Sequence, residues 1–226
     1  MVLKACIFDF DGTLGDSMWV WEAVIGEFFE RCGVQPAVDD MERLAQLGMA
    51  RGAAEFVERY RLEQTPQQVI AEWLAAARRK YAADVRLKPG AREFLQQLRR
   101  RGVKTGIATA QERETLMMAL ENEGALTLLD VVLTCDEVCS TGKSTPEVYW
   151  EAARRLGVQP AECLVFEDVL GPAQQAHAGG FGVVGVRDDS PAQDSEALRA
   201  EADDFVSSFT ELLGEEGMRR LELLRA

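Results

Sequence analysis

Leu3-Lys4-Ala5-Cys6-Ile7-Phe8-Asp9-Phe10-Asp11-Gly12-Thr13 decides the fold. Its first half is a short apolar run, which predicts a buried β-strand. Asp9 and Asp11 are two residues apart, so on an extended chain both side chains point to the same side. Two carboxylates this close repel and raise each other's pKa. A protein tolerates them most easily where a cation or a proton transfer uses them. An ordinary Asp-Gly turn after a strand is the alternative interpretation.

Three later apolar runs also lead into polar residues. They are Val103 to Ala108 before Thr109, Val131-Val132-Leu133 shortly before Lys143, and Cys163 to Phe166 before Glu167-Asp168. Strands alternating with helices predict an α/β fold, with a Rossmann-like parallel sheet and right-handed crossovers. Ligands bind such sheets at the carboxyl ends of the strands. Acids, a hydroxyl and an ammonium at that edge would suit a divalent cation and a phosphoryl group.

One segment breaks this α/β rhythm. Between about Trp19 and Tyr81, apolar residues recur at helical spacing and no strand pattern is strong. The segment is too long for a simple crossover between two strands. We therefore expect an inserted all-helical domain at residues 16–86, and an α/β core domain made of residues 1–15 and 87–226.

Composition restricts the classes of partner. The chain has 226 residues, with 25 Lys and Arg against 38 Asp and Glu, which gives a net charge of -13. Such a charge argues against nonspecific binding to nucleic acid or to an anionic membrane. The apolar runs are too short to cross a bilayer. Five cysteines without framework spacing favour a reducing compartment. We expect a cytoplasmic protein with neither nucleic acid nor membrane as a partner.

The motifs resemble those of the haloacid dehalogenase-like hydrolases, in the branch of small-sugar phosphatases and β-phosphoglucomutase. Asp9-Phe10-Asp11-Gly12-Thr13-Leu14 is similar to the first motif of that family, Thr109 to the second and Lys143 to the third. Leu164-Val165-Phe166-Glu167-Asp168 is similar to the fourth. The resemblance covers nearly the whole chain, and it implies that the helical insert is a cap over the active site.

The resemblance and the chemistry of the side chains together suggest roles. Asp9 is the expected nucleophile, because a carboxylate can attack phosphorus and form an aspartyl phosphate. Asp11 is the expected general acid and base. Thr109 would donate a hydrogen bond to a phosphoryl oxygen, and Lys143 would stabilise the charge there. The expected cofactor is Mg2+. Its expected ligands are Asp9, Asp168 and the backbone carbonyl of Asp11, with Glu167 as a further candidate.

The expected substrate is a small phosphorylated metabolite, most readily a sugar phosphate. Two basic residues of the insert resemble substrate-binding residues of the phosphoglucomutase-like branch. They are Arg51, in Gly48-Met49-Ala50-Arg51, and Lys80. The alternative for both is a solvated helix surface on which they pair with nearby Glu residues. A monomer or a homodimer is expected.

The sequence departs from the family pattern at three places. Ala110 follows Thr109 where relatives often carry a small polar residue. Ser144 stands where a Pro commonly follows the third-motif Lys. The chain between Asp168 and Gly171 is one residue shorter than the pattern, which puts the role of Glu167 in doubt.

Other functions remain open at this stage. A β-phosphoglucomutase-like isomerase carries a histidine where this chain has Trp21, so this chain lacks one part of that chemistry. A true dehalogenase typically has an aromatic residue in place of Asp11, so the second acid argues against that function. A binding or regulatory protein on an inactive scaffold is the alternative from a different class, since function depends on the site and not on the fold. Ser-His-Asp chemistry is disfavoured, because the only histidine, His177, fits a structural role at the end of a helix.

Overall fold

The computed structural model describes residues 3–139, 141–191 and 193–225. The chain divides into two compact units, one formed by residues 1–18 and 85–226 and the other by residues 19–84. The division falls within a few residues of the limits expected from the sequence. That the second unit acts as a cap stays a prediction.

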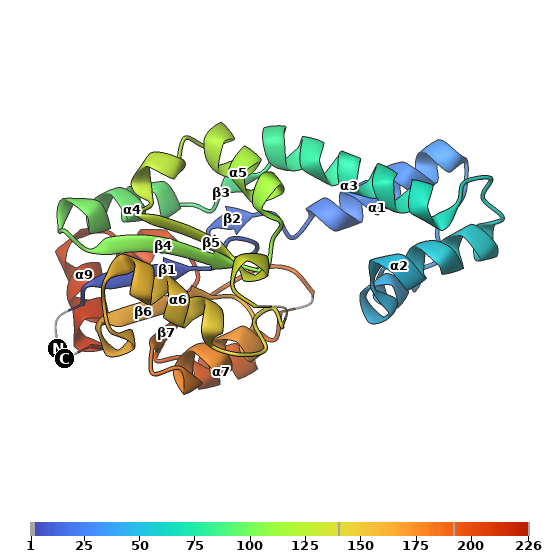
Figure 1. The fold of residues 1–226 in the computed structure, drawn as a ribbon. Coiled ribbons are helices and arrows are strands. Elements are labelled where there is room, and N and C mark those ends of the chain that lie inside the picture. Colours follow the sequence, from blue (N-terminus) through green and yellow to red (C-terminus); the bar gives the residue numbers. More distant parts are fainter. Residues whose placement is uncertain (1–2, 140, 192, 226) are drawn as a thin grey trace. The chain divides into compact units, whose positions relative to one another are not determined.

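The first unit contains both strands and helices (Figure 1). Its strands are β1 (Ala5–Phe8), β2 (Gly15–Asp16), β3 (Arg86–Leu87), β4 (Lys104–Thr109), β5 (Val131–Thr134), β6 (Cys163–Glu167), β7 (Gly182–Val186) and β8 (Asp204–Val206). Its α-helices are α4 (Ala91–Arg100), α5 (Arg113–Asn122), α6 (Glu147–Leu156), α7 (Leu170–Ala178), α8 (Ser195–Glu201) and α9 (Gly214–Leu223). Short 3-10 helices are η1 (Leu126–Leu128), η2 (Cys135–Glu137), η3 (Pro160–Glu162) and η4 (Phe209–Leu212).

Among the described residues, the main sheet has six parallel strands in the order β5-β4-β1-β6-β7-β8. The predicted α/β fold class is therefore confirmed. Strand β1 lies in the middle, with β4 on one side and β6 on the other. The chain adds strands to one side of β1 and later to the other. Open α/β sheets bind ligands where the strand order reverses in this way.

Both faces of the sheet are covered, which explains why β1 is apolar along its whole length. Ala5 and Ile7 pack on the face that α6 and α7 cover (Figure 1). Phe8 points to the opposite face, where it stacks on Phe166 and meets Phe94 of α4 edge to face. Alternation along the strand thus divides its side chains between two apolar layers.

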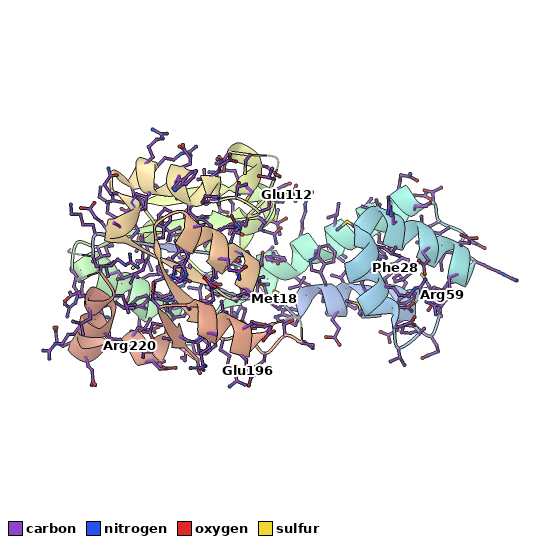
Figure 2. The ribbon with its side chains drawn as sticks, turned by 90° about the horizontal axis from the view of Figure 1, so that it is seen from below. Met18, Phe28, Arg59, Glu112, Glu196 and Arg220 are labelled. Atoms are coloured by element: carbon purple, nitrogen blue, oxygen red, sulfur yellow. The ribbon has the colours of Figure 1, made fainter. Side chains whose placement is uncertain are left out.

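The second unit is helical and contains α1 (Val20–Cys32), α2 (Asp40–Tyr60) and α3 (Pro66–Ala83). Its core is aromatic: Phe28, seen inside this unit in Figure 2, meets Trp73 edge to face at 5.6 Å between ring centroids. Helix α3 begins with a capping box between Thr65 and Gln68. Helix α2 is interrupted at Gly48, whose φ of 73° and ψ of 166° are not helical.

Strands β2 and β3 carry the chain out of the sheet unit and back into it. They pair antiparallel, with Gly15 opposite Leu87 and Asp16 opposite Arg86. The two connections to the helical insert therefore lie side by side, although they are far apart in sequence. Among the described residues, no helix has the length and apolar character needed to span a membrane.

His177 lies near the end of α7 and contacts two acids. Its Nδ1 is 2.8 Å from Glu201 Oε1 and its Nε2 is 3.2 Å from Asp203 Oδ2. Burial acts to lower the pKa of His177, but the two carboxylates raise it above its usual value. The charged imidazole therefore links α7 to the segment before β8, which agrees with a structural role.

We expect His177→Gln to destabilise the protein in a pH-dependent way. Because the folded-state pKa is raised, the contribution is fully present below the unfolded pKa of about 6.5 and is lost as pH rises through the folded pKa. The loss of unfolding free energy should be about 1 kcal/mol in mild acid, since the site is partly exposed. Urea unfolding of parent and variant, from below the unfolded pKa to above the folded pKa, measures this difference in unfolding free energy. A difference that grows with pH would contradict this account.

Candidate active site

The register of three strands brings the first predicted residues together. Phe8 of β1 pairs with Ile107 of β4 and with Phe166 of β6. Asp9 follows β1 directly, and its N–H donates to the carbonyl oxygen of Phe166 at 3.0 Å. Thr109 and Glu167 are the last residues of β4 and β6. Neighbouring parallel strands thus deliver a carboxylate, a hydroxyl and a second carboxylate to one edge of the sheet.

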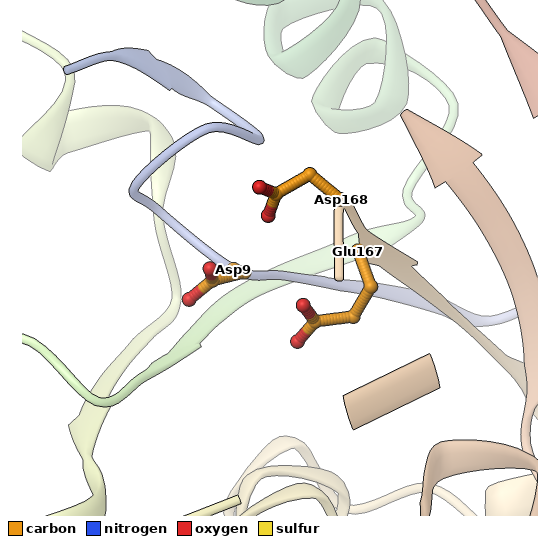
Figure 3. Close-up of side chains that lie close together, drawn as sticks. All are labelled: Asp9, Glu167 and Asp168. Carbon is orange, nitrogen blue, oxygen red and sulfur yellow. The ribbon is translucent and has the colours of Figure 1, made fainter. Parts of the chain in front are cut away.

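Three carboxylates gather at this edge. One oxygen from each of Asp9, Glu167 and Asp168 lies within 4.8 Å of the others. Figure 3 shows the three side chains around a common space. All three are buried, at 8%, 0% and 2% exposed respectively. Buried carboxylates repel strongly, so such a cluster needs compensating positive charge.

Lys143 supplies part of that charge. Its Nζ lies 2.6 Å from Asp9 Oδ1 and 2.6 Å from Glu167 Oε1. Burial acts to lower the pKa of Lys143, but the two carboxylates raise it above its usual value, so the ammonium stays charged. Tyr149 of α6 donates its hydroxyl to the same Oε1 of Glu167 at 2.6 Å. One oxygen of Glu167 is therefore held by two donors.

The remaining charge of the cluster fits a cation. Glu167 Oε2 is buried and has no hydrogen-bond partner among the described residues. Burial raises the pKa of Glu167 to about 8, although Lys143 lowers it. Burial and then repulsion from Asp9 raise the pKa of Asp168 to about 7. Oxygen donors that are buried, converging and incompletely compensated suit a hard divalent cation such as Mg2+.

Asp11 lies beside the cluster on the loop after β1. Its Oδ1 accepts the hydroxyl of Ser17 at 2.6 Å, and its Oδ2 accepts the side-chain amide of Gln111 at 3.0 Å. A pocket of about 350 Å³ opens here. Its lining includes Asp9, Asp11, Met18, Thr109, Ala110, Gln111, Lys143, Glu167, Asp168, Val169 and Pro172. The four predicted catalytic residues and both predicted acids of the fourth motif therefore share one pocket.

Further contacts hold Asp168 in place. Thr13 Oγ1 donates to Asp168 Oδ1 at 2.9 Å, which ties the first motif to the fourth. The side-chain amide of Gln193 donates to the carbonyl oxygens of Asp168 and Val186, both at 2.8 Å. Contacts of this kind orient ligands and tune a metal site.

The helical unit carries the two predicted substrate-binding residues. Arg51 is exposed on α2. Lys80 pairs with Glu27 of α1, and its Nζ lies 5.7 Å from the centroid of the Trp19 ring. These contacts lie within the helical unit, and a role of Arg51 and Lys80 toward substrate stays a prediction.

Sequence reasoning did not identify the partners of Asp11. Gln111 follows Thr109 by two residues, and Ser17 follows Asp11 by six. The only available signal was the position of Gln111 just beyond a strand end, where polar groups meet the pocket. The sequence also does not predict the contact of Tyr149 with Glu167. Nor does the sequence predict the contact of Gln193 with the carbonyl oxygen of Asp168, because Gln193 lies in a distant loop.

A parallel α/β sheet with clustered acids at its carboxyl edge is typical of a class of hydrolases. A family model for haloacid dehalogenase-like hydrolases matches residues 3–177. The chain belongs to this family, and the assignment made from the motifs is confirmed.

Curated relatives and solved structures agree with this assignment. Validoxylamine A 7'-phosphate phosphatase of Streptomyces hygroscopicus subsp. limoneus is 35% identical over 214 residues, covering 92% of this chain and 95% of that protein. The putative phosphatase YhcW of Bacillus subtilis (strain 168) is 32% identical over 184 residues, covering 80% and 81%. A putative β-phosphoglucomutase from Thermotoga maritima has a TM-score of 0.83 at 24% identity, covering 97% and 99%, which shows the shared fold. The relatives support an enzyme of this family, a phosphoric monoester hydrolase.

Proposed function

We propose that the protein is a magnesium-dependent phosphatase that hydrolyses a small phosphorylated metabolite, a sugar phosphate, through an aspartyl phosphate on Asp9. One observation carries the proposal: the Asp9 carboxylate shares a buried pocket edge with Lys143, Glu167 and Asp168. An anionic nucleophile beside a fixed cation and a candidate metal site suits attack on a phosphate ester.

The first step forms the covalent intermediate. An oxygen of Asp9 attacks phosphorus, and the bond from phosphorus to the leaving oxygen breaks with its electron pair on that oxygen. Asp11 gives the leaving oxygen a proton, which produces an alcohol. Thr109 Oγ1 accepts the N–H of Gln111 at 3.1 Å, so its own hydrogen can be directed toward a phosphoryl oxygen.

The second step regenerates the enzyme. Water attacks the phosphorus atom of the aspartyl phosphate, and Asp11 takes a proton from that water. The bond between phosphorus and Asp9 breaks, which releases inorganic phosphate and restores the carboxylate. Lys143 stabilises the negative charge of the phosphoryl oxygens in both steps.

Asp9, Asp168, Glu167 and the backbone carbonyl of Asp11 would hold the magnesium ion. When bound, the ion would neutralise charge between the phosphate and the nucleophile, so that one anion can approach another. The unpartnered Glu167 Oε2 supports a cation at this place.

The relatives support a sugar-like substrate. Two similar proteins are named a validoxylamine A 7'-phosphate phosphatase and a phosphorylated carbohydrates phosphatase. Arg51 and Lys80 are proposed to attract the anionic substrate. An isomerase is less well supported, because Trp21 stands where the mutase-like enzymes carry a histidine.

A phosphate-release screen over phosphorylated metabolites tests this proposal. The purified protein should release inorganic phosphate from sugar phosphates when magnesium is present, and the best substrates should identify the class. Release from none of the phosphomonoesters, with the protein folded and magnesium supplied, would reject the phosphatase.

We expect Gly12→Ala to weaken the metal site. Gly12 has a φ of +74°, and a Cβ there would clash with Asp168 Oδ2 and lie 2.8 Å from Asp168 Cγ. The Asp168 carboxylate would have to move, which should weaken magnesium binding by about 10–100-fold. The magnesium-dependent rise in Tm measures the affinity.

Gly102→Ala is the matched control for this experiment. Gly102 has a φ of +73°, but apart from its two chain neighbours no described residue comes within 4 Å of an added Cβ, so Gly102→Ala carries the same backbone strain without the clash. It should lose stability and keep the response to magnesium. An unchanged magnesium response in Gly12→Ala would show that the contact with Asp168 does not matter.

A further inference from the structure

The carboxylate of Asp11 is held on both sides. Ser17 donates to Oδ1 from the loop that follows, and Gln111 donates to Oδ2 from beyond β4, 100 residues away in sequence. The two donors differ in chemistry. A hydroxyl can donate or accept, whereas the amide NH2 of Gln111 can only donate. Gln111 therefore keeps Oδ2 as an acceptor, whether or not the other oxygen carries a proton.

The amide of Gln111 is itself fixed at its other end. Its Oε1 accepts the backbone N–H of Glu112 at 2.9 Å. Rotating the amide by half a turn would place Oε1 against the carboxylate of Asp11 and the NH2 against an N–H. Both contacts would be repulsive, so the hydrogen-bond network determines the orientation. The donor is thus aimed at Asp11 before any substrate binds.

Gln111 also touches a second residue of the site. Its backbone N–H donates to Oγ1 of Thr109 at 3.1 Å. One residue therefore contacts the expected acid and the expected phosphoryl-binding hydroxyl, and it lines the same pocket. A solvated polar residue at the start of a helix would need neither contact. The two hydrogen bonds, made by backbone and side chain, favour a role in the site.

We propose that Gln111 is a positioning residue that holds the carboxyl group of Asp11 at the angle from which it protonates the leaving oxygen. This inference rests on the proposed function, in which Asp11 is the general acid. Proton transfer depends strongly on geometry, and a loose carboxyl group would spend less time within reach of the leaving oxygen. Gln111 acts through Asp11 and does not itself exchange a proton.

The test compares two leaving groups. The leaving group of glucose 6-phosphate is a sugar alkoxide, which needs a proton to depart. The leaving group of p-nitrophenyl phosphate is p-nitrophenolate, a stable anion that needs little help. The ratio kcat/KM reports steps up to the first irreversible one, so it isolates formation of the phosphoenzyme. Gln111→Met keeps the length of the side chain and removes the donor. We expect it to lose about tenfold in kcat/KM on glucose 6-phosphate and much less on p-nitrophenyl phosphate.

A second variant and a control sharpen the result. Gln111→Glu keeps an oxygen for the Glu112 N–H but places a negative charge against Asp11. Its loss of kcat/KM on glucose 6-phosphate, relative to that on p-nitrophenyl phosphate, should therefore exceed the loss in Gln111→Met. Glu121→Gln changes an exposed residue of α5, the helix that follows Gln111, and should match the parent. Thermal unfolding shows that each variant is folded. Equal losses on both substrates, or no loss, would overturn the role of Gln111.

Asp11→Asn in the same assay separates the two levels of the account. If it shows the selective loss and Gln111→Met does not, the inference fails and the proposed function stands. If Asp11→Asn keeps full activity on glucose 6-phosphate, the general acid is wrong, and the role of Gln111 fails with it.

Discussion

Asp9→Asn should abolish turnover while the protein remains folded. Asparagine has nearly the same shape, but it lacks the negative charge that attacks phosphorus and binds a cation. Loss of a nucleophile from a covalent mechanism lowers kcat by several orders of magnitude, on the order of 10⁴–10⁶-fold. Phosphate release at saturating substrate measures the effect, and thermal unfolding shows that the fold survives.

Asp136→Asn is the matched control for Asp9→Asn. Asp136 is exposed in η2 and does not line the pocket, so the change removes one negative charge without touching the site. Its activity should equal that of the parent. If purified Asp9→Asn hydrolysed phosphomonoesters near the parent rate, Asp9 would not be the nucleophile.

Removal of magnesium should have the second largest effect. Treatment with a chelator followed by desalting should lower turnover by at least about 100-fold, because the negative charges of the nucleophile and the phosphate would lose the ion that neutralises them. Added magnesium should restore activity. It should also raise the stability of the enzyme without substrate, by about 2.7 kcal/mol at a concentration 100 times Kd.

Asp168→Asn tests whether the cation binds at the predicted cluster. It removes a charged ligand, so the same magnesium concentration should raise Tm less than in the parent. Asp136→Asn again serves as the control and should keep the full rise in Tm.

For the chelation experiment, undiminished turnover of the chelated and desalted parent enzyme would reject the requirement for a metal.

Much of the fold and of the pocket could be predicted from the sequence, for a physical reason. Buried parallel strands are recognisable as short apolar runs, and their carboxyl ends must meet at one edge of the sheet. Asp9, Thr109 and Glu167 each end or follow such a run, so their proximity followed from their order. Lys143 could be placed only by resemblance to a family motif, because the loop that carries it has no periodic pattern.

Contacts between loops could not be predicted in this way. Gln111 reaches Asp11 across 100 residues, and Gln193 reaches the carbonyl of Asp168 across 25. No hydrophobic period encodes such contacts, because they depend on how two turns are oriented after the sheet has formed. The break of α2 at Gly48 is similar, since it depends on a positive φ that the sequence permits but does not require.

The most direct test of the central claim is to capture the phosphoryl group on Asp9. In Asp11→Asn supplied with p-nitrophenyl phosphate, the good leaving group allows the first step, while loss of the base slows attack by water. Acid quenching during turnover, followed by peptide mass spectrometry, should show one added phosphoryl group on Asp9. The Asp9→Asn/Asp11→Asn double variant should show none. Turnover with no phosphoryl group on Asp9, or with the group on another residue, would contradict the account.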